Sequence, residues 1–401
     1  MQCGKSCFCL KILFTLSQFL IYRLPMLKEL IIPVTELPVM KQFQESSDLL
    51  GFTLKNATWD VNNLPDAAII GIPEGRTSFC SNISEGPDSI RQQLFLLSNF
   101  PDDFRVVDLG NIKCGKDPSD TFAAVKMVAE ELSALNIPLL ILGGSQDLTE
   151  PLISGFEKEN LDVTIIDDRI DNCMNINSSN DEIFINNLPF RTVINIIGGQ
   201  SYFISQQGHD DVSEGFNGNV VTLGEVRSDI KEIEPLLRGT DLVSFDFGAM
   251  KLSEAPGQVR LSPNGLTGEE ACQLAWYSGI ATSPVWFGLF GYAPLLDPYS
   301  SGAMMAAQIC WYYLNGISKR IDTIPEGEAT DFIHFQIPID ELEETISFLK
   351  HPVSNRWWLE VPTEDCSDFP LRIPCSKKDY RKACKNEIPG RWWKYFNDHS
   401  I

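Results

Sequence analysis

An apolar run that ends in a carboxylate and a glycine stands at Leu242-Val243-Ser244-Phe245-Asp246-Phe247-Gly248. The run is continuously apolar instead of alternating, which is typical of a strand buried on both faces of a parallel sheet. A segment compatible with a helix follows at residues 267–279, and another apolar run lies at residues 285–290. This succession of strand, helix and strand predicts an α/β fold.

The same alternation recurs about eight times along the chain. The other predicted strands are Ala67–Gly71, Phe104–Leu109, Pro138–Leu142, Val163–Ile166, Thr192–Ile197, Asn219–Leu223 and Val285–Phe290. The predicted helices are Gly86–Ser98, Ser119–Leu135, Asp147–Glu157, Val226–Leu237, Thr267–Gly279 and Ser300–Asn315. We therefore predict a three-layer α/β/α domain with a mainly parallel eight-stranded sheet. Ligands of such folds bind where the chain leaves the carboxyl ends of the strands.

The composition is that of a globular protein and argues against nucleic-acid binding. Of the 401 residues, 43% are hydrophobic, which is enough for a large core. Asp and Glu number 54 against 32 Lys and Arg, so the net charge is −22. Because phosphate neutralisation needs clustered cations, we expect no nucleic-acid partner. Eleven cysteines without regular spacing predict reduced thiols and a cytoplasmic location rather than a disulfide scaffold.

The two ends of the chain differ from its middle. Residues 1–25 contain the apolar stretch Phe8–Leu24, which is either a membrane anchor or an extension of the reading frame ahead of a true start at Met26. Polar residues interrupt this stretch, so we favour the second interpretation and expect no membrane partner unless the anchor is real. Residues 26–323 are predicted to form the α/β domain. Residues 324–401 are predicted to form a C-terminal extension whose two Trp-Trp pairs pack against other side chains.

Polar residues gather directly after four of the predicted strands. They are Gly143-Gly144-Ser145-Gln146-Asp147, Asp167-Asp168-Arg169-Ile170-Asp171, Ser244-Phe245-Asp246-Phe247-Gly248 and Gly291-Tyr292-Ala293-Pro294. The third group is followed by Ala255-Pro256-Gly257. Since the carboxyl ends of parallel strands meet at one edge of a sheet, we expect these residues to line a common pocket.

These strand ends resemble the motifs of the ureohydrolase superfamily, which comprises arginase, agmatinase and formimidoylglutamase. That family carries G-G-D-H-[ST], D-[AS]-H-x-D and S-[FIVL]-D-[IVL]-D at three strand ends, and the third is followed by A-P-G. An earlier family element resembles Gly71-Ile72-Pro73 and Gly86-Pro87-Asp88-Ser89-Ile90-Arg91. The likeness runs from about Pro65 to Gly316, and the tail is similar to that of a divergent bacterial arginase-like branch.

The resemblance implies an arginase-like fold, self-association into trimers or hexamers, and a hydrolysis that uses two Mn²⁺ ions. In that chemistry a metal-bridged hydroxide attacks a guanidinium or formimino carbon. The sequence departs from the family at several positions. Gln146 and Arg169 stand where the two family histidines are expected, Gly248 where an aspartate is expected, and Gly291 where a substrate-contacting glutamate is expected.

Three of the six expected metal ligands are retained, namely Asp167, Asp171 and Asp246. A guanidinium has no lone pair to give a metal, but it presents donors that suit carboxylates. We therefore predict that Arg169 replaces the metals and holds these three aspartates by charge-assisted hydrogen bonds. On this hypothesis no cofactor is expected, whereas an active site would need two Mn²⁺ ions on the same aspartates.

Other candidates have a chemical and a structural interpretation. Asp147 and Asp168 are either extra oxygen ligands of a weak Mg²⁺ or Ca²⁺ site, or a helix N-terminal charge and a solvated loop residue. His209 is predicted to lie in a surface loop, and Cys173 lacks a partnered histidine that would make it a nucleophile. Three functions stay open: a catalytically silent binding or structural protein, an active amidine hydrolase resembling formimidoylglutamase or arginase, and a different enzyme in the same pocket.

Overall fold

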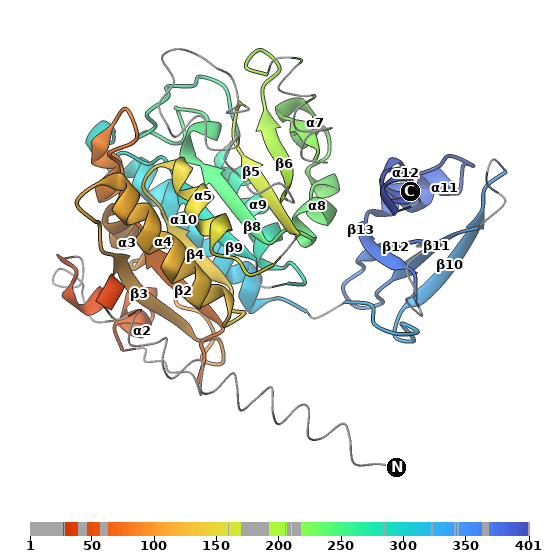
Figure 1. Ribbon diagram of the computed structural model, residues 1–401, viewed down its shortest axis with the longest axis horizontal. Helices are drawn as coiled ribbons and strands as arrows, with labels where there is room; N and C mark the ends of the chain where they lie inside the picture. Colours follow the sequence, from red (N-terminus) through yellow and green to blue (C-terminus); the bar gives the residue numbers. More distant parts are fainter. Residues whose placement is uncertain are drawn as a thin grey trace.

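A computed structural model describes most of the chain and divides it into a main region and a C-terminal region (Figure 1). The described residues are 27, 29–38, 46–56, 63–158, 160–169, 192–204, 206, 210, 218–283, 285–321, 324–340, 342, 345–362 and 369–399. The predicted N-terminal segment 1–25 and its alternative start at Met26 therefore lie outside the described residues, as do Asp171, Cys173 and His209. None of the described helices is both long enough and apolar enough to span a membrane.

The main region is built on one nine-stranded sheet with the strand order β1-β3-β2-β4-β9-β8-β5-β6-β7. The strands are β1 (Ile31–Ile32), β2 (Ala67–Gly71), β3 (Val106–Ile112), β4 (Leu139–Leu142), β5 (Leu161–Ile166), β6 (Thr192–Gly199), β7 (Val220–Thr222), β8 (Leu242–Asp246) and β9 (Trp286–Phe290). All eight predicted strands form and all pair in parallel. The ninth strand, β1, is a two-residue antiparallel edge that is too short to give an apolar run.

Helices cover both faces of this sheet, which confirms the predicted three-layer α/β/α architecture (Figure 1). The helices are α2 (Leu50–Asn56), α3 (Gly86–Leu94), α4 (Pro118–Ser133), α5 (Thr149–Ser154), α7 (Leu223–Ser228), α8 (Glu234–Arg238), α9 (Gly268–Gly279) and α10 (Ser301–Ser318). Apolar side chains of α4 and α5 belong to the core on one face. Those of α3, α9 and α10 belong to the core on the other face.

Local sequence signals explain where these helices begin and end. Helix α9 begins after Thr267, whose hydroxyl accepts from the Glu270 amide at 3.2 Å while the Glu270 carboxylate accepts from the Thr267 amide at 2.8 Å. This reciprocal capping satisfies two amides that have no partner inside the helix. The predicted helix Val226–Leu237 is in fact two helices, α7 and α8, with Pro235 in the first turn of α8. A proline is favourable there because its missing N–H is not needed, whereas it would break a continuous helix.

The C-terminal region, residues 324–399, has a sheet and a core of its own. Its antiparallel strands are β10 (Ile333–Pro338), β11 (Thr345–Lys350), β12 (Trp357–Val361) and β13 (Leu371–Cys375), followed by α11 (Lys377–Ala383) and α12 (Gly390–His399). Trp357 packs in one core with Trp392, whereas Trp358 packs in another with Leu349. Adjacent strand residues point to opposite faces, so one Trp-Trp pair serves two layers.

Candidate functional site

The candidate site lies at the carboxyl ends of four strands that are neighbours in the sheet, in the order β4-β9-β8-β5. Gln146 follows β4, Gly291 follows β9, Asp246 ends β8 and Asp167 follows β5. The parallel arrangement therefore brings residues that are up to 145 positions apart in the sequence to one edge. The prediction of a common pocket at this edge is consistent with that placement.

A guanidinium joins the two described aspartates of the site. Arg260 Nη2 lies 2.9 Å and 3.2 Å from the two carboxylate oxygens of Asp167, and it also donates to Asp246 Oδ2. The Asp167 side chain is fully buried, and the Arg260 side chain is 18% exposed. Two buried carboxylates close together would repel each other, so the cation between them offsets a large electrostatic cost.

Backbone amides hold the same two carboxylates. The amide of Asp168 donates to Asp167 Oδ1 at 2.6 Å, and the amide of Gly248 donates to Asp246 Oδ1 at 2.7 Å. Each aspartate therefore has both a charged and a neutral donor, which is the arrangement that ionised buried carboxylates require.

Two glycines make room for this arrangement. A Cβ atom at Gly248 would lie 3.2 Å from Asp246 Oδ1, which is a tight contact, and 3.5 Å from both Nε and Nη2 of Arg260, where further side-chain atoms would have to fit. A Cβ atom at Gly291, whose φ is +79°, would lie 2.6 Å from Asp246 Oδ1. The positions where the family resemblance implies an aspartate and a glutamate thus carry no side chain, and the Arg260–Asp246 ion pair occupies the neighbouring space.

Arg169 does not have the role that we predicted for it. Its Nε donates to Asp168 Oδ1 at 2.9 Å, and its guanidinium carbon lies 4.3 Å from the centre of the Phe203 ring. Burial, the largest influence, lowers the pKa of Arg169, but the hydrogen bond to Asp168 and the negative charges of Asp168 and Asp167 together raise it above its usual value. The cation that bridges Asp167 and Asp246 is Arg260. Asp168, which we had considered a solvated loop residue, is fully buried and paired.

The strand end after β4 carries polar atoms that are not satisfied. Gln146 donates to Ser244 Oγ at 3.3 Å, but its Oε1 is buried with no hydrogen-bond partner in the described part of the chain. Asp147 Oδ1 is likewise buried without a hydrogen-bond partner in the described part of the chain. Burial raises the pKa of Asp147, although hydrogen bonds from Ser145 and Thr77 oppose the shift. Asp147 lies in the first turn of the 3-10 helix Gln146–Leu148, which leads directly into α5, so its position near a helix N-terminus agrees with the predicted one.

The described side chains do not fit a pair of divalent metal ions. Within the described ranges, no group of three or more His, Cys, Asp or Glu side chains is arranged to hold a metal. Asp171, the third retained candidate ligand, lies outside those ranges. The Arg260 guanidinium stands between Asp167 and Asp246, and it has no lone pair for a metal and repels one electrostatically. The charges of Asp167 and Asp246 are thus neutralised by Arg260, a side chain of the same chain.

Sequence reasoning missed Arg260 although the other members of the cluster were predicted. The residue lies three positions after Ala255-Pro256-Gly257, in the long loop that follows β8. Nothing in its local pattern distinguishes it from a solvated loop cation. The sequence holds only an indirect indication of its role. Gly248 lacks the carboxylate that the family resemblance implies, whereas Asp246 is retained, so a cation has both the space and a negative partner there.

Comparisons with known proteins agree with this fold. A sequence model of the arginase family matches residues 65–315. Formimidoylglutamase from Bacillus subtilis is 25% identical over 292 residues, which are 65% of this chain and 90% of that protein. Its crystal structure aligns with a TM-score of 0.59 at 21% identity, covering 70% of this chain and 95% of that one. Formiminoglutamase from Trypanosoma cruzi, solved with Mn²⁺₂, aligns with a TM-score of 0.59 at 18% identity, covering 69% and 100%.

Proposed function

Because this chain belongs to the arginase family, we propose that it has lost the binuclear manganese site and the hydrolysis that depends on it. We infer that it acts instead as a binding or structural protein. The observation that carries this proposal is the contact of Arg260 with both Asp167 and Asp246. A fixed cation supplies in this chain the positive charge that metals would supply to the same carboxylates.

The energetics of the cluster favour the guanidinium over a metal. Desolvating three charged groups costs several kcal/mol per group, and a bridging cation with matched hydrogen bonds offsets that cost. A divalent ion would have to displace Arg260 from a nearly buried position and leave its guanidinium close by. It would also find Gln146 and Arg169 where imidazoles are needed, and imidazole is a common and strong ligand for such ions.

An assay of amidine hydrolysis tests the proposal. Purified full-length protein, supplied with Mn²⁺, is given arginine, agmatine or N-formimino-glutamate, and the release of urea, formamide and ammonia is measured. We expect no release above that of the Asp246→Ala variant. Release that depends on Mn²⁺ and is abolished by Asp246→Ala would contradict the proposal.

A gain-of-function variant sharpens this test. The combined changes Gln146→His, Arg169→His, Gly248→Asp and Arg260→Ala restore the family residues and remove the bridging cation. We expect this variant to bind Mn²⁺ more tightly than the parent chain, because carboxylate and imidazole ligands replace a guanidinium. The variant Arg260→Ala alone is the matched control for the loss of the cation.

An active hydrolase is the second candidate function. It is favoured by the 25% identity to a formimidoylglutamase over nine-tenths of that protein. It would require Asp167 and Asp246 to exchange Arg260 for metal ions on ligand binding. The Asp246→Ala comparison above separates the two functions, since only an active site would lose turnover.

A further inference from the structure

A second polar site lies between the main region and the C-terminal region, at the opposite edge of the sheet from Arg260. A cavity of about 610 Å³ opens there between α8, the end of α9 and the residues around β12 and α11. Helix α8 precedes β8 and Ile280 precedes β9, so the cavity lies at the amino ends of the strands. Its volume falls in the range of sites for small ligands.

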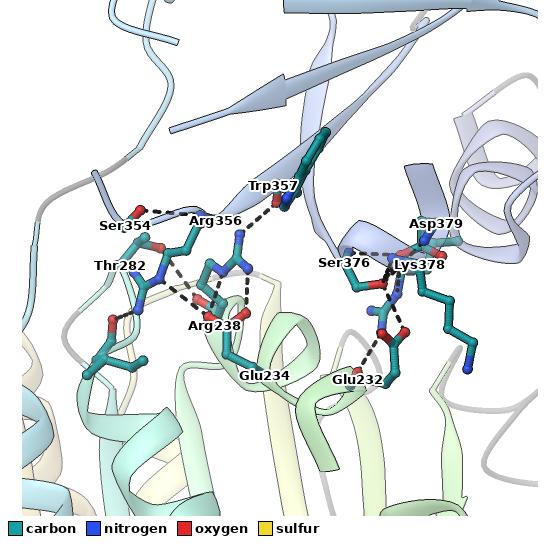
Figure 2. A network of polar contacts seen from close by, with 12 residues as sticks. Glu232, Glu234, Arg238, Thr282, Ser354, Arg356, Trp357, Ser376, Lys378 and Asp379 are labelled. Atoms are coloured by element: carbon teal, nitrogen blue, oxygen red, sulfur yellow. Dashed lines mark hydrogen bonds and ion pairs between the residues drawn. The ribbon is translucent and has the colours of Figure 1, made fainter. Parts of the chain in front are cut away.

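The floor of this cavity is a network of ion pairs and hydrogen bonds that fixes the two regions together (Figure 2). Arg238 donates to Glu234 Oε1 at 3.0 Å and to the Trp357 carbonyl at 2.7 Å. Arg356 Nε lies 3.4 Å from the same Glu234 oxygen, and its Nη2 donates to the Ile280 carbonyl. Ser376 Oγ donates to Glu232 Oε2 at 2.9 Å. The walls are therefore held rigidly in a defined relative position.

The lining of the cavity has the opposite charge to the protein as a whole. Seven of its 19 lining residues are Lys or Arg and three are Asp or Glu, whereas the chain has 32 basic and 54 acidic residues. Two of the seven cations, Arg238 and Arg356, are paired with Glu234. Four others form no ion pair with any described residue: Lys231, Lys377, Lys378 and Arg381.

These four cations come from both sides of the cavity. Lys231 belongs to the main region, and the other three belong to α11. Figure 2 shows the Lys378 side chain extending away from its helix with no dashed line at its ammonium group. All four side chains are exposed and therefore solvated, but together they create a local positive potential that attracts multiply charged anions.

The cavity also has an aromatic wall. Trp276 is a half-buried part of the lining. Trp357, on the other side, is buried, and its ring is stacked against Phe335 and Tyr380, so the indole that is partly accessible is that of Trp276. An indole next to unpaired cations suits a flat ring that carries charged groups, because stacking and ion pairing then act on one molecule.

We propose that this interregional cavity binds a small ligand with phosphate groups and an aromatic ring, that is, a nucleotide or a compound of that class. The lining carries four more cations than anions. A single carboxylate would neutralise one of these charges, whereas each phosphate monoester brings about −1.5 to −2. The site is separate from the Asp167–Arg260–Asp246 cluster, so its test does not depend on the proposed loss of hydrolysis.

Isothermal titration calorimetry of the full chain with ATP, tripolyphosphate and adenosine tests this proposal. We expect ATP to bind, tripolyphosphate to bind more weakly, and adenosine to give no measurable heat. Quenching of tryptophan emission by ATP provides a second readout, since two tryptophans line the cavity. No binding of either phosphate compound would overturn the proposal, and equal binding of tripolyphosphate and ATP would overturn the assignment of the ring.

Charge-reversal variants locate the binding. We expect Lys378→Glu with Arg381→Glu to weaken ATP binding by about tenfold or more, and Lys231→Glu, across the cavity, to weaken it in the same direction. The control is Lys319→Glu with Lys385→Glu, which changes the net charge equally at exposed positions outside the lining. If the control weakens binding as much as the test pair does, the interaction is a general charge effect and the site is refuted.

Discussion

Strand β5 has an aspartate near each end, the half-buried Asp162 and the fully buried Asp167, and the two carboxylates are stabilised in different ways. Asp162, near the amino end, accepts hydrogen bonds from Asn195 at 2.9 Å and Thr240 at 3.2 Å, both of which are neutral. Asp167, just past the carboxyl end, is paired with the guanidinium of Arg260 at 2.9 Å. Burial, reinforced by the charge of Asp241, raises the pKa of Asp162 to about 7.

The contrast extends to the two edges of the sheet. At the carboxyl edge, the described cations are used internally: Arg260 holds Asp167 and Asp246, and Arg169 holds Asp168. At the amino edge, Arg356 is paired with Glu234, but Lys377, Lys378 and Arg381 of the C-terminal region have no acidic partner among the described residues. A site whose side chains neutralise one another has no net charge to attract an ion. A site with an excess of one charge attracts a ligand of the opposite charge.

The largest effect is expected from removing the cation at the carboxyl edge. Arg260→Ala leaves Asp167 and Asp246 as uncompensated buried carboxylates, which should lower the free energy of unfolding by about 3–5 kcal/mol at neutral pH. Urea unfolding at neutral pH measures the effect.

The control for that prediction is Lys126→Ala. Lys126 and Glu130 form an exposed pair at 4.0 Å, and loss of such a pair costs about 0–1 kcal/mol. Equal unfolding midpoints for the two variants would show that Arg260 does not hold the cluster together.

A somewhat smaller effect is expected at the amino edge. Arg238→Ala removes the donor to Glu234 and to the Trp357 carbonyl, but Arg356 still neutralises Glu234, so we expect a loss of about 2–3 kcal/mol. Faster proteolytic separation of the two regions should accompany it. Arg381→Ala, which removes an unpaired cation of the same cavity, should leave stability unchanged. Identical behaviour of these two variants would contradict the role given to Arg238.

The last effect concerns pH and is confined to one pH window. Because the pKa of Asp162 is about 7 in the folded chain and about 4 when unfolded, the folded state holds an extra proton between these values. Stability from this group is therefore fully present below about pH 4 and is lost as the pH rises toward 7. Asp162→Asn should flatten the stability profile in that window by about 4 kcal/mol, since each of the three pKa units is worth about 1.4 kcal/mol. A profile as steep as that of the parent chain would show that Asp162 titrates normally.

The fold was predictable where burial determines the sequence pattern. The strands β2, β4, β8 and β9 are buried along their whole length, so each is a continuous apolar run, and helices such as α9 carry recognisable first turns. The short edge strand β1 and the strands β11, β12 and β13 of the small C-terminal sheet were not predicted, because edge and one-sided strands give weaker patterns. In β13, for example, only Ile373 and Cys375 are buried.

The candidate site was predictable only in part, for a different physical reason. Asp167 and Asp246 end buried strands, and strand ends have fixed positions in a parallel sheet. Arg260 lies in a loop, and which carboxylates a loop cation reaches depends on the path of the loop, which local pattern does not specify. Arg169 was predicted to hold the aspartates because it directly follows a strand end. In the structure its guanidinium is instead paired with the neighbouring Asp168.

Equilibrium dialysis of the full-length chain against Mn²⁺, followed by metal analysis of the protein, tests most directly whether Arg260 has taken the place of the metals. The account predicts no manganese retained above the amount held by Asp167→Ala or Asp246→Ala variants. Two manganese ions per chain, lost when either aspartate is replaced, would contradict it.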